Sequence, residues 1–463
     1  MNNKIVFDFN NKNSHIHFIG IGGISMSGLA ELLLSLGYSV SGSDSTQTAL
    51  TDSLMSKGAK IFIGQKAENI DSSIDIVIAT AAIREDNPEL SKCRELNIPV
   101  MSRAELLGQV MKLYKNSIAI AGTHGKTTTT SMMSEIFLTD ELDPTISVGG
   151  ILKSISGNFH IGSGDTFITE ACEYTNSFLD FYPTVEIILN IDADHLDFFK
   201  DIDDIRNSFK KFAALLPDNG TLIINSDIPN YKEITEGLTC HVVTFGHDVS
   251  SDYSASDITY DEFGRPEYSL LYKGKDMGRI SLGVTGEHNV YNSLSTIALA
   301  NIFNISNNSI LAALKSFSGT DRRFQYKGEL NGFTIIDDYA HHPTEISATL
   351  SAASKYPHNE LYVLFQSHTY SRTKALLNEF AQALKAADHV LLVPIYAARE
   401  TDTLGVSSDD LCELIKKSGT DSVSLPDFAS AEEYILKNLK KSDLLITMGA
   451  GDIVKVGENL LKK

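Results

Sequence analysis

Residues 117–130 read SIAIAGTHGKTTTT, and this stretch decides the class of fold. The apolar run SIAIA predicts a short buried strand, and KTTTTSMMSEIFLT predicts the helix that follows. Between them, GTHG must turn sharply and leaves backbone N–H groups at a helix N-terminus, where phosphate binds. Lys126 can reach the terminal phosphates of a nucleotide, and Thr127 can offer its hydroxyl to a magnesium ion. The stretch therefore predicts an α/β domain that binds phosphate.

The loop differs from the full phosphate-loop pattern. In G-x-x-x-x-G-K-[ST] the first glycine would fall on position 120, where this chain has Ile120. The pattern is thus shortened to G-x-x-G-K-T. The alternative interpretation is a plain threonine-rich helix start without a ligand.

A second glycine turn lies upstream, in HIHFIGIGGISMSGLAELLLSLGYSVSGSD, residues 15–44. It predicts a strand over 15–20, a helix from about Ser27 and a strand ending at Asp44, which is a βαβ unit. The dinucleotide fingerprint G-x-G-x-x-G would need glycine where the chain has Ser25. The turn therefore predicts a diphosphate site rather than a complete NAD fingerprint. The alternative is a turn that only lets strand and helix pack closely.

Acidic side chains follow two later strands. Glu170 ends the apolar run of GDTFITEACEY, and VEIILNIDADHLD places Asp192, Asp194, His195 and Asp197 after another strand. In parallel sheets, ligands gather at the carboxyl ends of strands. Thr127, Glu170 and His195 are therefore expected to converge on one or two metal ions. The alternative for His195 is a solvated loop histidine, since imidazole is an unusual magnesium ligand.

The second half of the chain adds an appendage and a third unit. Residues 240–285 alternate polar and apolar and predict a small antiparallel appendage. In the helix that begins at GEHNVYNSLS, His288, Asn289 and Asn292 share a face and suit either adenine or helix capping. From residue 320 on, strands and helices alternate again, and their loops bring four polar residues to strand ends: Asp338, His341, His342 and Arg372.

Composition and charge narrow the class of protein. The 463 residues predict two to four domains, at ~100–200 residues each. Acidic residues outnumber basic ones 59 to 39, for a net charge of −20, which argues against nucleic acid as a partner. Four scattered cysteines predict a reducing compartment and no zinc ribbon. The N-terminus does not resemble a signal peptide, and no apolar run approaches the ~18–20 residues of a membrane span. We therefore expect a cytoplasmic enzyme with no membrane partner.

Seven motifs occur in order along the chain and together resemble the Mur ligase family. They are HFIGIGGISMSGLAE, GTHGKTTTT, TEACEY, NIDADHLD, GEHNVYNSLS, DRRFQ and DDYAHHPTE. The resemblance covers essentially the whole chain and implies three α/β domains. These would be a Rossmann-like domain for a UDP-sugar over 1–112, a P-loop ATPase-like domain for ATP over 113–319, and a Rossmann-like domain for an amino acid over 320–463.

The resemblance also implies a reaction. The motifs are most similar to those of members that use ATP and Mg²⁺ to join L-alanine to the carboxylate of UDP-N-acetylmuramate through an acyl phosphate. This is the first amino-acid addition to the cytoplasmic peptidoglycan precursor. One alternative is a sister ligase that attaches a tripeptide to the same sugar nucleotide. Two wider alternatives are an NAD-dependent oxidoreductase and a nucleotide-sensing switch.

For the nucleotide, the resemblance implies the following roles. The ATP phosphates would be wrapped by Gly122, Thr123, His124, Gly125, Lys126, Thr127 and Thr128. Asn289 and Asn292 would face the adenine side. Thr127 and Glu170 would hold one Mg²⁺, and Glu170 and His195 a second that bridges the γ-phosphate and the substrate carboxylate. The catalytic set is then Lys126, Glu170, His195, Arg323 and Asp338, the last two reaching the nucleotide from the third domain.

Two further sets follow from the resemblance. The UDP-sugar would be bound by Gly20, Gly22, Gly23, Ser25, Asp44 and Thr80. The amino acid would be surrounded by Tyr339, His341, His342 and Arg372, with Arg372 on its carboxylate. Against that role stands the alternative that Arg372 pairs with a helix-surface acid such as Glu379.

Two departures from the family pattern matter. Some members carry an arginine where QSHTYSRT has Thr369, which shifts carboxylate recognition onto Arg372. Sister ligases use a carbamylated lysine to support the second metal ion, and Lys210 lies at about the right distance after His195. Because Lys211 follows it in an amphipathic stretch, a solvated helix face is the preferred interpretation.

Overall fold

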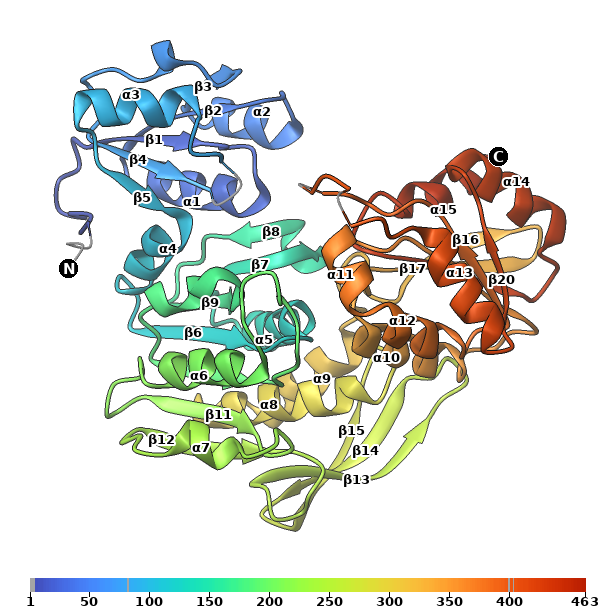
Figure 1. The fold of residues 1–463 in the computed structure, drawn as a ribbon. Coiled ribbons are helices and arrows are strands. Elements are labelled where there is room, and N and C mark those ends of the chain that lie inside the picture. The colour runs from blue at the N-terminus through green and yellow to red at the C-terminus, as the bar shows by residue number, and fades with distance from the viewer. Residues whose placement is uncertain (1–4, 81–82, 399, 403) are drawn as a thin grey trace.

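The protein forms three α/β units, each built on its own sheet (Figure 1). The computed structural model describes residues 5–80, 83–398, 400–402 and 404–463. The N-terminal unit and the C-terminal unit lie on separate sides of the central unit, which confirms the predicted three-part α/β architecture. None of the described helices is both long and apolar enough to cross a membrane.

The N-terminal unit is a five-stranded parallel sheet of order β3-β2-β1-β4-β5. Its elements are β1 (His15–Ile19), α1 (Ile24–Ser35), β2 (Ser39–Asp44), α2 (Ala49–Ser56), β3 (Lys60–Ile63), β4 (Ile76–Ala79), α3 (Pro88–Leu96), β5 (Val100–Ser102) and α4 (Arg103–Met111). Helix α1 begins earlier than the expected Ser27. Ile24 is 54% exposed, so the first turn of α1 lacks the apolar spacing from which the helix was predicted.

The central unit is a ten-stranded sheet of order β15-β14-β13-β12-β11-β10-β6-β9-β7-β8. The predicted strand, loop and helix of the phosphate loop are confirmed as β6 (Asn116–Ala121) and α5 (Lys126–Thr139). The other elements are β7 (Thr145–Leu152), β8 (Gly157–His160), β9 (Thr166–Ala171), β10 (Val185–Ile188), α6 (Ile202–Ala213), β11 (Thr221–Asn225), α7 (Tyr231–Thr235), β12 (His241–Phe245), β13 (Tyr253–Tyr260), β14 (Pro266–Tyr272), β15 (Lys275–Ser281), α8 (His288–Ile302) and α9 (Asn307–Ser316).

The predicted antiparallel appendage is present, but it is part of the central sheet. Strands β13, β14 and β15 pair antiparallel with one another, and β13 joins β12 through a parallel pair between Phe245 and Tyr253. The three strands therefore extend the sheet on one side and carry the turn at residues 261–265 toward the C-terminal unit.

The C-terminal unit is a six-stranded sheet of order β16-β17-β21-β18-β19-β20, in which only β16 runs antiparallel to its neighbour. Its elements are β16 (Gln325–Leu330), β17 (Phe333–Asp338), α10 (Pro343–Ala353), β18 (Leu361–Phe365), α11 (Tyr370–Ala375), α12 (Leu377–Leu384), β19 (His389–Leu392), α13 (Ser408–Lys417), β20 (Asp421–Ser424), α14 (Phe428–Asn438), β21 (Leu444–Met448) and α15 (Val454–Leu460).

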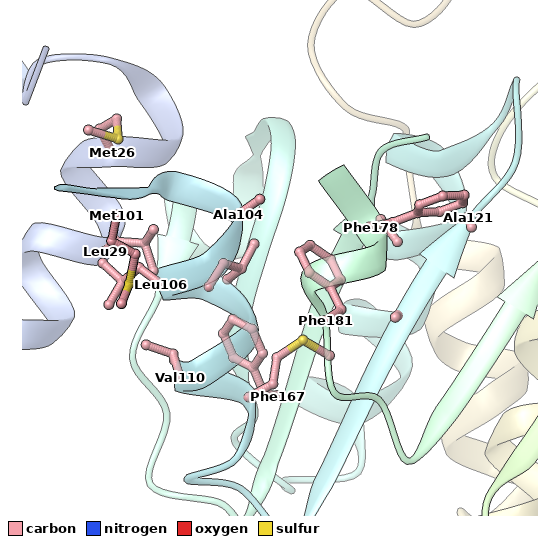
Figure 2. Close-up of a cluster of buried hydrophobic side chains, with 14 of the residues drawn as sticks. Met26, Leu29, Met101, Ala104, Leu106, Val110, Ala121, Phe167, Phe178 and Phe181 are labelled. Carbon is pink, nitrogen blue, oxygen red and sulfur yellow. The ribbon is translucent and has the colours of Figure 1, made fainter. Parts of the chain in front are cut away.

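Helix α4 joins the N-terminal and central units into one apolar core (Figure 2). Leu106 and Val110 of α4 belong to the same buried cluster as Met101 of the N-terminal sheet and Phe167 of the central sheet. Gly108 touches the central unit so closely that a Cβ there would lie 2.0 Å from the carbonyl oxygen of Asp180. The two units are therefore packed rigidly against each other through this helix.

Candidate active site

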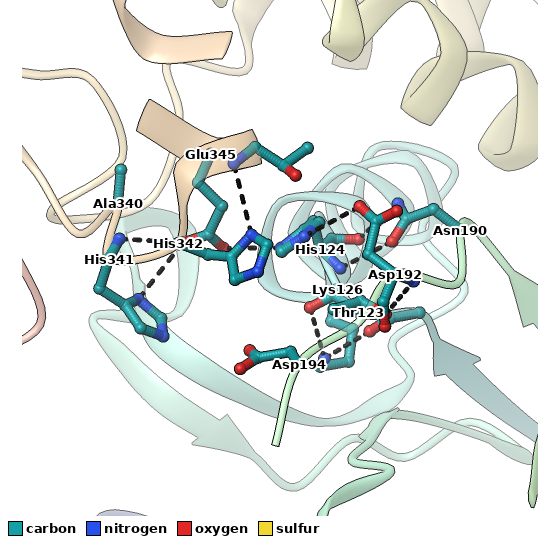
Figure 3. Close-up of polar contacts among 12 residues, drawn as sticks. Thr123, His124, Lys126, Asn190, Asp192, Asp194, Ala340, His341, His342 and Glu345 are labelled. Carbon is teal, nitrogen blue, oxygen red and sulfur yellow. Dashed lines mark hydrogen bonds and ion pairs between the residues drawn. The ribbon is translucent and has the colours of Figure 1, made fainter. Parts of the chain in front are cut away.

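The phosphate loop connects β6 to α5 and depends on two glycines with positive φ. Gly122 has φ +148°, and a Cβ there would lie 2.9 Å from the Leu189 side chain. Gly125 has φ +84°, and a Cβ there would lie 3.0 Å from the side chain of Asn292. The His124 N–H donates to Asn190 Oδ1 at 2.8 Å, which ties the loop to the end of β10 (Figure 3). Only glycine can both adopt these positive φ values and fit into the space available at these two positions.

Lys126 is held inside the loop by a carboxylate that the sequence analysis did not select. Its Nζ lies 3.0 Å from the Glu173 carboxylate and donates to the backbone oxygens of Gly122 and Thr123. Glu173 is only 2% exposed. Burial acts to lower the pKa of Lys126, but the charge of Glu173 outweighs it and raises that pKa. The second acid of TEACEY, three residues after Glu170, was the available signal for this residue.

Oxygen donors suited to magnesium gather beside the loop. The Thr127 hydroxyl donates to Glu170 Oε2 at 3.1 Å, and the backbone N–H of Gly149 donates to the other Glu170 oxygen. A Cβ on Gly149 would lie 3.0 Å from both carboxylate oxygens, and one on Gly150 would lie 3.2 Å from Thr127 Cγ2. The glycine pair in β7, also not selected from the sequence, is what lets Glu170 and Thr127 meet.

His195 lies at the same end of the sheet but contacts different acids. Its Nε2 is 3.8 Å from Glu173 and 3.8 Å from Asp194, and its ring lies 4.7 Å from the Tyr174 ring. Within the described residues, no three His, Cys, Asp or Glu side chains are arranged to hold an ion by themselves.

The C-terminal unit reaches the phosphate loop through His124 (Figure 3). The His124 ring lies 3.2 Å from the Glu345 carboxylate of α10 and 3.1 Å from Asp192. Burial acts to lower the pKa of His124, but the bonds to Asp192 and Glu345 outweigh it and raise the pKa to about 9. The protonated imidazole therefore bridges an acid of the central unit and an acid of the C-terminal unit.

Arg372 makes a second contact between the same units. Its guanidinium lies 3.0 Å from the Asp194 carboxylate, so its partner in the structure is Asp194 and not the alternative Glu379. Burial acts to raise the pKa of Asp194, but Arg372 and His195 outweigh it and lower that pKa.

A cavity of about 420 Å³ between the central and C-terminal units adjoins the phosphate loop. Residues from both units line it, among them His124, Gly125, Thr128, His288, Asn289, Asn292, Arg323 and Asp338. Of the two arginines in DRRFQ, Arg322 pairs with Asp337 at 3.1 Å, which leaves Arg323 to line the cavity. Burial raises the pKa of Asp338 to about 6, and its carboxylate accepts two backbone N–H bonds.

One wall of this cavity is aromatic, and the sequence analysis missed it. The wall consists of Phe263, Phe324, Tyr326 and Tyr356. Phe263 comes from the turn between β13 and β14, and its ring lies 6.1 Å from that of Tyr356 at the end of α10. Two of the predicted polar residues that line the same cavity contact each other, since the Asn292 amide donates to Asn289 Oδ1 at 3.0 Å.

A second cavity of about 290 Å³ joins the His195 loop to the C-terminal unit. It is lined by Tyr339, His341, Arg372, Asp194 and His195, and also by Thr369 and Glu400. Burial lowers the pKa of His341 to about 4, so its imidazole is neutral. His342 is not in this lining, because its Nε2 lies 3.3 Å from the carbonyl oxygen of Ala193 and its ring lies beside His124.

The residues predicted for the UDP-sugar gather around the first glycine turn. A Cβ on Gly20 would lie 3.0 Å from Thr80 Cγ2, and the Gly22 N–H donates to Asp44 Oδ2 at 2.9 Å. Gly23 caps α1, and Ser25 in the first turn accepts a hydrogen bond from Arg103. By contrast, Lys210 is 44% exposed and pairs with Glu236 at 3.3 Å, as expected for a solvated helix face.

Comparison with known proteins gives matches over nearly the whole chain. The model described as "Mur ligase family, catalytic domain" matches residues 15–115, "Mur ligase middle domain" matches 120–300, and "Mur ligase, glutamate ligase domain" matches 322–451. A UDP-N-acetylmuramate–L-alanine ligase of Lachnospira eligens is 62% identical over 98% of this chain and 99% of its own length. The corresponding ligase of Agathobacter rectalis is 55% identical over 97% of this chain and 98% of its own length.

Solved structures agree with these matches. The UDP-N-acetylmuramate-alanine ligase of Thermotoga maritima superposes with a TM-score of 0.81 at 30% identity, covering 97% of this chain and 98% of that chain. A murein peptide ligase of Psychrobacter arcticus superposes with a TM-score of 0.70 at 25% identity, with the same coverage of 97% and 98%.

Proposed function

The chain belongs to the Mur ligase family, and on that premise we propose how its residues join L-alanine to the carboxylate of UDP-N-acetylmuramate. The protein is an ATP-dependent ligase of peptidoglycan precursor synthesis. The observation that carries the assignment of roles is a series of contacts that runs from the second cavity to Lys126 in the phosphate loop. Arg372 contacts Asp194, Asp194 and Glu173 flank His195, and Glu173 contacts Lys126. The amino acid and the γ-phosphate therefore meet at one place.

Activation of the carboxylate is the first step. An amine does not displace oxide from a carboxylate, so a carboxylate oxygen attacks the γ-phosphorus of ATP, ADP leaves, and an acyl phosphate forms. Phosphoryl transfer of this kind depends on positioning and on neutralising charge. Lys126 supplies a positive charge at the phosphate loop, and Arg323 and Asp338 meet the nucleotide from the C-terminal unit. Thr127 and Glu170 would hold one Mg²⁺, and Glu170 and His195 a second, and the two ions would offset further charge on the phosphates.

The amine of alanine then attacks the acyl carbon, and the tetrahedral intermediate expels phosphate to leave the amide. Arg372 and Tyr339 line the cavity that we assign to the amino acid, with the neutral His341 beside them. His342 lies outside this cavity, where its imidazole contacts the Ala193 carbonyl and packs beside the His124 ring. Closure of the C-terminal unit over the central unit keeps water from the acyl phosphate.

The remaining assignments extend this proposal. The glycine turn with Gly20, Gly22, Gly23, Ser25, Asp44 and Thr80 would bind the UDP-sugar. Domain boundaries near residues 112 and 319 would separate the three substrates' binding units. The four cysteines are free thiols, which is typical of a reducing compartment and supports a cytoplasmic location.

Phosphate release tests the substrates directly. The enzyme with ATP and Mg²⁺ is given UDP-N-acetylmuramate and, in turn, L-alanine or the tripeptide substrate of the sister ligase. We expect release only when UDP-N-acetylmuramate and L-alanine are both present, with one phosphate per amide. Faster release with the tripeptide would assign the chain to the sister activity. A rise in absorbance with NAD in place of ATP would favour an oxidoreductase.

A further inference from the structure

Arg103 is a partly buried cation, and its charge has no acidic partner among the residues that the structure describes. It is the first residue of α4, and its Nη1 donates to the Ser25 hydroxyl at 3.0 Å. Among the residues that the structure describes, no carboxylate lies within 4.0 Å of its guanidinium. Burial lowers the pKa of Arg103, which shows that the site by itself disfavours the charge. An uncompensated buried charge is costly, so the position is explained best by an anion that arrives with a ligand.

The location narrows the identity of that anion. Arg103 lines a cavity of about 670 Å³ between the N-terminal and central units, together with hydroxyl residues such as Thr80 and Thr175. Three acids also line it, Glu85, Glu105 and Asp180; Glu85 pairs with Arg94, and Glu105 accepts a bond from the Ser102 N–H. Its bond to Ser25 brings the guanidinium to the glycine turn at the start of α1. Thr175 and Ser177 closely follow Glu173, the acid that contacts Lys126, so this side of the cavity lies near the phosphate loop. A ligand that runs from the glycine turn toward Lys126 therefore passes Arg103.

The other arginine of this cavity does not have a free charge. Arg94 also lines it, but its guanidinium pairs with Glu85 and its side chain is 57% exposed. Arg103 thus provides, within the described part of the chain, a guanidinium near the turn that bonds Ser25 but no acid. Such a fork matches phosphate oxygens in bidentate geometry, which the ammonium of a lysine does not.

We propose that Arg103 binds the diphosphate of the UDP-sugar, and that Ser25 orients its guanidinium toward it. This rests on the proposed function, because it takes the glycine turn as the UDP-sugar site. Backbone N–H groups of the turn and the guanidinium would then hold the diphosphate from two sides, one from α1 and one from α4. Since α4 also packs on the central unit, binding at Arg103 would fix the UDP-sugar relative to the phosphate loop.

Calorimetric titration of the whole protein tests the proposal. The ligands are UDP-N-acetylmuramate, UDP-N-acetylglucosamine, UDP, uridine and ATP, and the variants are Arg103→Gln, Arg103→Lys and the matched control Arg94→Gln. We expect Arg103→Gln to weaken the three diphosphates alike, by roughly ten- to a hundredfold, the range of a charge-assisted hydrogen bond. Uridine and ATP should bind as in the wild type, and Arg94→Gln should bind every ligand normally. Arg103→Lys should recover only part of the loss.

Other results would contradict either the proposed role of Arg103 or the proposed function. A loss confined to UDP-N-acetylmuramate would place Arg103 on the lactyl carboxylate, which UDP-N-acetylglucosamine lacks. Unchanged affinities would reject a binding role altogether. If Arg103→Gln fails to fold, Arg103→Lys is compared with the wild type instead. If this variant binds UDP as tightly as the wild type does, the bidentate contact is rejected. If the wild-type protein binds none of the UDP compounds, the proposed function fails and not only the role of Arg103.

Discussion

At the scale of single residues, two of the cations in the candidate active site, Lys126 and Arg372, are already paired with acids of the protein. Lys126 lies 3.0 Å from the Glu173 carboxylate, and Arg372 lies 3.0 Å from that of Asp194. Under the proposed function, the γ-phosphate and the carboxylate of alanine would approach these same cations. Each substrate anion must therefore share or replace a buried carboxylate, so binding is coupled to the rearrangement of a charge pair.

The first prediction concerns Lys126. Lys126→Met should abolish ligation, because the phosphates lose their positive charge, and should leave binding of UDP-N-acetylmuramate nearly unchanged. Glu173 would then be a buried acid without its partner, so Glu173→Gln is combined with Lys126→Met to keep the variant folded. Amide formation and calorimetric binding are measured on both variants. If the variant turns over ATP normally but loses affinity for the UDP-sugar, the assignment of ATP to the phosphate loop and of the UDP-sugar to the first glycine turn is wrong.

The second prediction concerns Arg372. Arg372→Ala should raise the KM for L-alanine far more than that for ATP, because a charge-assisted contact to the carboxylate is lost. Such a contact is worth about 1.5–3 kcal/mol, or roughly ten- to a hundredfold in affinity. Lys374→Ala on the same helix is the matched control, since Lys374 is exposed and its ammonium donates to the Leu404 carbonyl, away from Asp194. If the KM for L-alanine changes by less than ~3-fold, Arg372 does not bind the alanine carboxylate and only contacts Asp194.

At the scale of elements, the hairpin of β7 and β8 links two sites. In β7, Gly149 donates to Glu170 beside the phosphate loop. In β8, Phe159 lies against α1, and the Asn158 amide donates to the Ile24 carbonyl at 3.1 Å. The hairpin therefore contacts Glu170, a proposed magnesium ligand, at one end and the first turn of α1, which follows the glycine turn, at the other.

The third prediction tests this contact through Gly28. A Cβ on Gly28 would lie 2.4 Å from the Phe159 ring, so Gly28→Ala should force α1 and β8 apart. We expect a lower melting temperature and weaker UDP-sugar binding. In a Phe159→Ala background the same Gly28→Ala change should be neutral or stabilising, since alanine is favoured over glycine inside a helix by about 1 kcal/mol. Equal destabilisation in both backgrounds would show that Phe159 is not the cause.

At the scale of the whole molecule, the N-terminal and central units share a core, whereas the C-terminal unit meets the central unit largely through polar contacts. Leu106 and Val110 of α4 lie in the shared core. The contacts on the other side include His124 with Glu345 and Arg372 with Asp194, next to two cavities. Because polar contacts beside cavities are easily exchanged for contacts with water or ligand, we expect the C-terminal unit to be the one that moves.

The fourth prediction is a pH dependence of this closed arrangement. The pKa of His124 is raised from an ordinary 6.5 to about 9, so its bridging charge is fully present below pH 6.5 and is lost as pH rises through about 9. Without nucleotide, the distance between labels on the central and C-terminal units should grow over that range, and stability should fall. Glu345→Gln should reduce the dependence, because Asp192 alone then faces the imidazole. A distance that is constant from pH 6.5 to 9.5 would contradict the role of His124.

The local order of the chain, the phosphate loop and the family were determined by the sequence alone. Strand, loop and helix at 117–139 follow from an apolar run, two glycines and a helix-forming segment, all within one stretch of chain. The motifs that resemble Mur ligases identified the family, which the comparisons confirm. These features are encoded by neighbouring residues, so no knowledge of the sheet order is needed to read them.

The partners of the charged residues were decided only by the tertiary structure. Arg372 and Asp194 are 178 residues apart, and Phe159 reaches Gly28 across two units. The Gly149 and Glu173 contacts likewise depend on β9 lying between β6 and β7. Residue types at a strand end show that a site exists, but which acid meets which cation depends on the order of strands and the docking of domains. Those are set by the packing of distant apolar surfaces, which no short stretch of sequence contains.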